Sequence, residues 1–198
     1  MPTALNTVFF DYICISEKQK RMQEEEKVWY AIRVTYNREM KVKEALDSRG
    51  IKNFIPMQYK AVVREGKCVK KLTPIIHNLI FIHIEPEAMR EFKMSTSLPI
   101  RYIMDKETHS PIVVPKHQMD NFIAVAGTHD EQLIYLNPEP GDFSRGDRVK
   151  IMGGPFEGAE GVFVRVKGDR RVVVCIDGVV AVATTFIHPS LIQKIEEK

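Results

Sequence analysis

The chain has few cysteines, and none of them form a paired motif. Cys14, Cys68 and Cys175 are scattered through the 198 residues, and no CxxC pair occurs. A disulfide scaffold or a structural zinc site needs cysteines in matched sets at short spacing. The sequence therefore argues against both and favours the reducing environment of the cytoplasm.

Long hydrophobic runs are also missing. No apolar stretch reaches the roughly 18 residues that a membrane-spanning helix needs. The first 15 residues are apolar in places, but they lack a basic start and contain Asp11, so they do not read as a signal peptide. We therefore expect no contact with a membrane, and we assign residues 1–27 to a solvated N-terminal leader.

Sequence signatures of enzymes are lacking as well. The chain contains no GxxxxGK[ST], GxGxxG, GxSxG or HExxH motif. His77 and His83 fall near one predicted strand, but no third metal ligand stands at a useful spacing from them. The expectation is a protein that is not an enzyme and that holds no metal and no cofactor.

The positive charge is unevenly distributed. The formal net charge is only +3, but most of the basic excess lies in residues 28–126, whereas residues 141–198 are nearly neutral. Basic side chains crowd one predicted hairpin in the first of these regions: Lys60, Arg64, Lys67, Lys70 and Lys71. Two interpretations stay open, since lysines on a hairpin either protect an exposed sheet edge or contact phosphates.

Residues 28–127 alternate between strand and helix patterns. Aromatic and β-branched residues predict strands at residues 29–34, 51–63, 68–72, 79–82 and 100–104. Helix signals follow Asn37, Pro86 and Pro115. We therefore expect an α+β domain in which helices pack on an antiparallel sheet.

The remaining part of the chain differs in composition. Residues 128–145 show no sustained periodicity and include two prolines close to a glycine, which predicts a linker. Residues 146–198 contain short, β-branched runs separated by glycine turns. Five short strands with tight turns predict a small closed barrel.

Two segments carry a family resemblance. Residues 145–162 form a glycine-rich pattern that resembles the KOW motif, and Trp29-Tyr30 together with residues 74–82 resembles the N-terminal domain of NusG transcription factors. The order and spacing of these segments are similar to the whole NusG family over residues 28–198, most of all to its specialised RfaH- and UpxY-type members. The resemblance implies an SH3-like barrel for the KOW domain.

The resemblance implies a function and a set of contacts. The N-terminal domain would bind the β′ clamp helices of RNA polymerase, with Arg33, Ile76 and Leu79 at the contact. This contact would promote processive transcription of a specific operon, such as an operon of surface-polysaccharide genes. The KOW domain would recruit a ribosomal protein or Rho.

The resemblance also implies a nucleic-acid contact, to non-template DNA or nascent RNA. The residues expected there are Arg38, Lys41 and Arg49 at the first helix, with the hairpin residues Lys67, Lys70 and Lys71 as the alternative.

Other interpretations remain. Ile76 and Leu79 lie on or beside a strand whose residues alternate between two faces, so either one alone is more simply explained as core. The protein class is open too, since a KOW domain also occurs in ribosome-associated and free RNA-binding proteins. An enzyme with an unfamiliar site has the least support.

The organisation predicts independent folding of residues 28–126 and 146–198. Limited proteolysis of the isolated protein is expected to cut between Thr128 and Arg145 and to leave two folded fragments, because few contacts cross a linker. Protection of that whole stretch would contradict independent domains.

Overall fold

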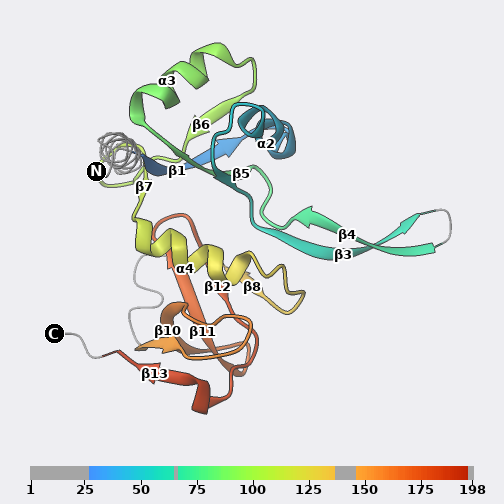
Figure 1. Ribbon diagram of the computed structural model, residues 1–198, viewed down its shortest axis with the longest axis vertical. Helices are drawn as coiled ribbons and strands as arrows, with labels where there is room; N and C mark the ends of the chain where they lie inside the picture. The colour runs from blue at the N-terminus through green and yellow to red at the C-terminus, as the bar shows by residue number, and fades with distance from the viewer. Residues whose placement is uncertain (1–26, 65–66, 137–145, 196–198) are drawn as a thin grey trace, which may run out of the picture.

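The described residues form two large antiparallel sheets with a helix between them, and a separate two-stranded hairpin. The computed structural model describes residues 27–64, 67–136 and 146–195 (Figure 1). The predicted leader, apart from Lys27, and residues 137–145 of the predicted linker lie outside the described residues. Helix α4 (Lys116–Ala126) runs between the two sheets, and a long hairpin extends away from them (Figure 1). The predicted α+β class is confirmed.

The first sheet belongs to the N-terminal half of the chain. Its strand order is β2-β5-β1-β6, and β7 also pairs with β1. The strands are β1 (Val28–Val34), β2 (Asn53–Phe54), β5 (Leu79–Ile84), β6 (Ile100–Tyr102) and β7 (Val113–Val114). Helices α2 (Glu39–Asp47) and α3 (Pro86–Ser95) supply buried residues to one core.

Alternation along the strands divides this sheet into two faces. One face buries Tyr30 and Ile32 of β1 together with Val42 of α2 and Phe92 of α3. The other face carries the alternate residues of β1, including Trp29 and Ala31, and helix α4 covers this face. The Phe122 ring of α4 lies 5.7 Å from Phe81 and 6.1 Å from Phe54, centroid to centroid.

The C-terminal sheet has six strands in the described residues, one more than the five predicted. Its order is β13-β9-β10-β11-β12-β8. The runs identified in the sequence form β9 (Asp147–Ile151), β10 (Glu160–Val166), β11 (Asp169–Ile176) and β12 (Val180–Ala183), whereas β13 (Ile192–Lys194) lies where the sequence pattern indicated no strand. Within the described residues, no pairing joins the two ends of this order, so the sheet is open at β13 and β8 where the sequence predicts a closed barrel.

The additional strand, β8 (Ile134–Leu136), comes from the predicted linker. It pairs with β12, with Tyr135 opposite Val182. Ile134 and Leu136 pack against the buried cluster on the outer face of the sheet, whereas Tyr135 packs against the cluster next to α4. Burial raises the pKa of Tyr135 to about 12. An apolar strand from the linker therefore occupies the edge of β12.

Helix α4 joins the two sheets into one buried core. The cluster that contains Trp29, Phe81 and Phe122 continues into Val174 and Val180 of the C-terminal sheet. Polar contacts lie at the rim of this core. Gln118 Nε2 donates to Asp177 Oδ2 at 2.6 Å, and the Asp177 amide donates back to Gln118 Oε1 at 3.3 Å. The Glu160 amide donates to Asn121 Oδ1 at 3.0 Å.

The segment between α4 and β8 is held by the hairpin. Gln58 Nε2 donates to the carbonyl oxygens of Asp130 and Leu133 at 2.8 and 3.4 Å. His129 Nδ1 lies 3.0 Å from the carbonyl oxygen of Met57. The predicted boundaries at residues 127 and 145 remain predictions, and within them residues 129–136 have defined partners.

Removing the polar rim should loosen the C-terminal sheet. In a Gln118→Ala/Asn121→Ala variant, three hydrogen bonds are lost, each with a net contribution of about 0.5–1.5 kcal/mol. We expect faster hydrogen–deuterium exchange in β11 and β12, with the exchange of β1 and β5 unchanged. Lys116→Ala is the matched control, because Lys116 forms its salt bridge with Asp120 on the same helix, at 2.6 Å. Unchanged exchange in the double variant would show that the apolar core alone holds the sheet.

Candidate functional site

The three residues expected to contact the polymerase lie together on the α4 face of the first sheet. Arg33 of β1 stands directly opposite Leu79 of β5 in the strand register. Arg33 is exposed, and Ile76 is partly buried against the cluster around α4. Leu79 is only 4% exposed and belongs to that cluster itself. The structure therefore pairs Arg33 with Leu79 and packs Ile76 against the same cluster, but it makes Leu79 part of the core.

A second arginine, which the sequence did not indicate, lies beside Arg33. Arg101 of β6 is the direct cross-strand partner of Arg33, and both side chains are exposed. Like charges directly opposite each other destabilise a sheet. Within the described residues, no salt bridge joins either guanidinium to a carboxylate. Arg33 and Arg101 therefore present two uncompensated charges next to an apolar patch, and we call Arg33, Ile76 and Arg101 the arginine patch.

The sequence alone does not predict that Arg101 lies beside Arg33. The sequence predicts a strand at residues 100–104, but it does not show which strand lies beside it. Only the pairing of β6 with β1 puts Arg101 next to Arg33.

The three basic residues expected at the first helix do not form one site. Arg38 immediately precedes α2, with its guanidinium 5.5 Å from the ring centroid of Tyr36. Lys41 is exposed in the first turn. Arg49 follows the other end of this nine-residue helix, which spans about 14 Å. There Arg49 donates to Ser95 Oγ at 3.0 Å and lies over the Phe92 ring.

The hairpin separates its lysines onto two faces. Strands β3 (Met57–Arg64) and β4 (Lys67–Pro74) pair along their whole length, and Lys60 stands directly opposite Lys71. Lys67 falls on the same face as these two, because alternate residues of a strand share a face. The sequence analysis named Lys67 and Lys71 as contacts but left out Lys60. We call Lys60, Lys67 and Lys71 the hairpin basic face.

Lys70 lies on the opposite face of the hairpin. Its ammonium forms a 2.7 Å salt bridge with Glu131, and the hydrogen bond to this carboxylate raises the pKa of Lys70. Lys70 thus ties the hairpin to the segment before β8. The structure separates it from the two other lysines with which the sequence analysis grouped it.

Between the lysines of the hairpin basic face lies a pair of apolar residues. Val62 and Val69 are cross-strand partners and are 36% and 49% exposed. Two uncompensated lysines directly opposite each other cost stability in the free protein. A polyanion that lies along this face would relieve the repulsion and release its own counterions.

The histidines do not assemble a metal centre. Among the residues that the structure describes, no three His, Cys, Asp or Glu side chains lie close enough together to hold a metal ion. His77 Nδ1 is 3.7 Å from Oε1 of Glu39, a carboxylate that is almost completely buried at the start of α2. His83 stacks on Trp29, with ring centroids 4.9 Å apart. No helix in the described ranges is long and apolar enough to span a bilayer.

The two faces of the hairpin predict different effects of lysine removal. Lys60→Gln/Lys71→Gln should weaken binding to a single-stranded oligonucleotide and lower the slope of log K against log salt by about 1.4, or 0.7 for each lost phosphate contact. Lys70→Gln is the control, because its ammonium is engaged by Glu131. Fluorescence anisotropy at several salt concentrations measures both slopes. An equal fall for both variants would contradict a one-sided contact.

Comparison with known proteins gives two findings. The family model described as transcription termination factor NusG matches residues 27–123. A solved structure that reports the domain interaction in NusG from Thermotoga maritima is 21% identical to this chain, covers 87% of it and 99% of its own chain, and has a TM-score of 0.41. Residues 27–123, which include the first sheet and the hairpin, are therefore similar to a NusG domain.

Proposed function

We propose that this chain, which has a NusG-type domain at residues 27–123, is a transcription elongation and antitermination factor that binds RNA polymerase through that domain. The family match is the observation that carries the proposal. We infer further that the protein acts in the cytoplasm, is not an enzyme, and belongs with the specialised RfaH- and UpxY-type members that serve a particular operon, such as one for surface polysaccharides.

The polymerase contact that we propose is centred on the arginine patch. Two adjacent exposed cations with apolar residues on one side suit a helical partner that has apolar residues beside carboxylates. The β′ clamp helices are the partner that the family resemblance implies. Leu79 supports this surface from within the core, since it is buried directly beside Arg33 in the register.

The nucleic-acid contact that we propose is the hairpin basic face. The hairpin extends away from both sheets (Figure 1), so that it can reach a strand next to the bound polymerase. Non-template DNA and nascent RNA both offer the phosphates that its lysines require. Arg38 and Lys41 at the start of α2 would contribute a second, separate contact.

The C-terminal sheet corresponds, in this proposal, to the KOW domain. It would recruit a second partner such as a ribosomal protein or Rho. The turn at Asp177 and Gly178 faces the first domain in this structure, because Asp177 is bonded to Gln118 and Gly178 lies against Ile112. A partner that uses this turn must therefore compete with α4.

An RNA-binding role without polymerase is the second candidate. Arg165 and Arg170 are direct cross-strand partners near the tip of the β10–β11 hairpin, and both are exposed. In this candidate the pair would contact phosphates from the C-terminal sheet, as expected for a ribosome-associated or free RNA-binding KOW protein. Copurification separates the two candidates, since the first predicts the β′ subunit and the second predicts ribosomal particles.

Charge reversal in the arginine patch should abolish polymerase binding without unfolding the protein. For Arg33→Glu and Arg101→Glu we expect at least a tenfold loss of affinity for a β′ clamp-helix fragment, because a lost interface anchor costs about 1–3 kcal/mol. The melting temperature should change little or rise, since the repulsion between the two arginines is removed. Biolayer interferometry and thermal unfolding measure the two effects.

Leu79→Asp serves as the control for the core. It buries an unpaired carboxylate, so the melting temperature should fall sharply and binding should be lost with the fold. Arg90→Glu is the matched surface control, because Arg90 lies on α3, an element of the opposite face. Full binding by folded Arg33→Glu and Arg101→Glu proteins, each tested as a single variant, would remove the arginine patch from the interface.

A further inference from the structure

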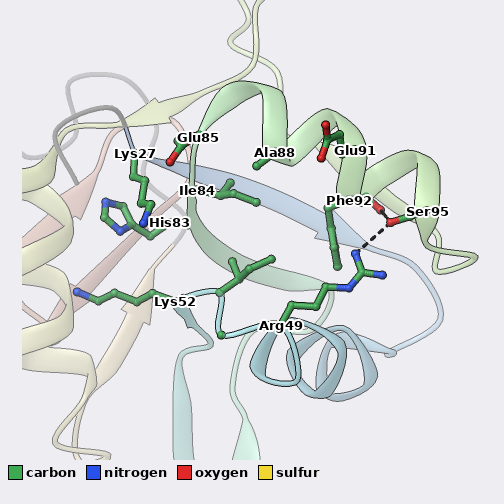
Figure 2. A pocket seen from close by; sticks show the side chains of 12 residues that line it. Lys27, Arg49, Lys52, His83, Ile84, Glu85, Ala88, Glu91, Phe92 and Ser95 are labelled. Atoms are coloured by element: carbon green, nitrogen blue, oxygen red, sulfur yellow. Dashed lines mark hydrogen bonds between the residues drawn. The ribbon is translucent and has the colours of Figure 1, made fainter. Parts of the chain in front are cut away.

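A cavity of about 590 Å³ lies on the first domain, away from both the arginine patch and the hairpin basic face. It is enclosed by the loop after α2, the end of β5 and one side of α3 (Figure 2). Pockets of 300–1,000 Å³ accept small-molecule ligands. This cavity is therefore large enough for a ligand well beyond the size of an inorganic ion.

One end of the cavity is basic and aromatic. Lys27, Lys52 and His83 lie at this end (Figure 2). The Lys52 ammonium is 5.6 Å from the centroid of the Trp29 ring, on which His83 stacks, and the His83 amide donates to the Lys52 carbonyl oxygen at 2.9 Å. These contacts fix the base of both side chains. They leave the ammonium groups of Lys27 and Lys52 without a carboxylate partner among the described residues.

The other end of the cavity carries a guanidinium plane. Arg49 lies over Phe92, with 4.9 Å from its central carbon to the ring centroid, and its bond to Ser95 is the dashed line in Figure 2. An arginine held by an aromatic ring and a hydroxyl in this way can stack on a further planar group. Between the two ends the wall is apolar and includes Ile84 and Ala88.

Two carboxylates complete the lining. Glu85 and Glu91 belong to the wall at the end of β5 and on α3, and neither forms a salt bridge with a lysine or arginine of the cavity in the described part of the chain. A cavity lined by both cations and carboxylates suits a ligand with both an anionic group and hydroxyl donors. Carboxylates accept hydrogen bonds from sugar hydroxyls, and lysines bind phosphate as point charges.

We propose that this cavity binds a nucleoside phosphate. The phosphate lies at Lys27 and Lys52, the sugar hydroxyls face Glu85, and the base packs on the apolar wall beside the Arg49 guanidinium. An inorganic anion would leave most of the cavity empty, and an uncharged apolar ligand would leave the lysines without a counterion. The same chemistry is presented by a free nucleotide and by one nucleotide of a single strand.

The proposal is tested by titration of the full-length protein, without polymerase, with AMP, GMP, CMP and UMP. Amide chemical shifts in two-dimensional NMR report where each ligand binds, and calorimetry gives the dissociation constant. Adenosine, ribose 5-phosphate and inorganic phosphate are the partial ligands. We expect at least one mononucleotide to bind about tenfold more tightly than any partial ligand, with shifts at residues 49–52, 83–85 and 88–95.

Two variants test the two halves of the cavity. Lys52→Gln should weaken nucleotide binding about tenfold, whereas Lys116→Gln, the same change of charge on α4, should leave it unchanged. Ala88→Phe fills the apolar wall without altering the charge and should abolish binding. Thermal unfolding of Ala88→Phe shows whether the fold is kept, and if it is not, Ala88→Leu takes its place.

Oligonucleotides of five nucleotides distinguish a free nucleotide from one nucleotide of a single strand as the ligand. A mononucleotide that binds as tightly as an oligonucleotide of the same base identifies a free nucleotide. An oligonucleotide that binds at least tenfold more tightly, and loses that affinity in Lys52→Gln and Ala88→Phe, identifies a strand. Absence of shifts at the cavity with every nucleotide and oligonucleotide would overturn the proposal. So would equal binding of inorganic phosphate, or unchanged binding in a folded Ala88→Phe protein. None of these outcomes depends on the polymerase contact.

Discussion

The arrangement of the whole molecule depends on helix α4, which is buried on two sides. Phe122 packs on Phe81 and Phe54 of the first sheet, and the same cluster continues into Val174 and Val180 of the C-terminal sheet. A helix between two sheets must be apolar over more than one stripe, and its remaining polar positions must find partners at the rim. Gln118 and Asn121 meet this requirement by bonding to Asp177 and Glu160. The two sheets are thereby held in one orientation, and the functional surfaces are left on the outside.

Strand β1 determines what those surfaces are. Its residues alternate between a core shared with α2 and α3 and a face shared with α4, and the last outward position of this second face is Arg33. Because β5 and β6 flank β1, Arg33 has an apolar neighbour on one side and a second arginine on the other. Repulsion between adjacent cations is a cost that folding alone does not explain. The same holds for Lys60 and Lys71 on the hairpin, so that both surfaces combine opposed like charges with exposed or half-buried apolar residues.

Local patterns were enough to predict the helices and longer strands of the first domain and strands β9 to β12 of the second, but not the short strands β7 and β13. Trp29-Tyr30, Pro86 and Pro115 mark the starts of a strand and two helices through backbone propensity, which acts within a few residues. Which face of a sheet each residue occupies could not be predicted without knowing which strands pair. Leu79 lies in the core and Arg101 on the surface because of the strands beside them, and Lys70 is separated from Lys71 because neighbours on a strand point in opposite directions.

The linker and the first helix show the same dependence on tertiary structure. Leu133, Ile134, Tyr135 and Leu136 are an apolar run, but a strand of three residues is stable only when a sheet edge such as β12 is available. Arg38, Lys41 and Arg49 are close in sequence, yet the helix between them carries Arg49 to another surface. There it meets Phe92 and Ser95 of α3, which the sequence did not connect with it.

Strand β8 begins at Ile134, one residue after Leu133, whose carbonyl oxygen is bonded to Gln58 of the first domain. Almost no chain length therefore separates the last anchor on the hairpin from the first strand of the C-terminal sheet. The entropy lost on closing a tether grows with its length, so this docking has a small entropic cost. A short tether also keeps the effective concentration of the C-terminal sheet at α4 high, in the millimolar range or above. Any molecule that competes for that face of α4 has to overcome this local concentration, and weak, transient competitors are excluded by mass action alone.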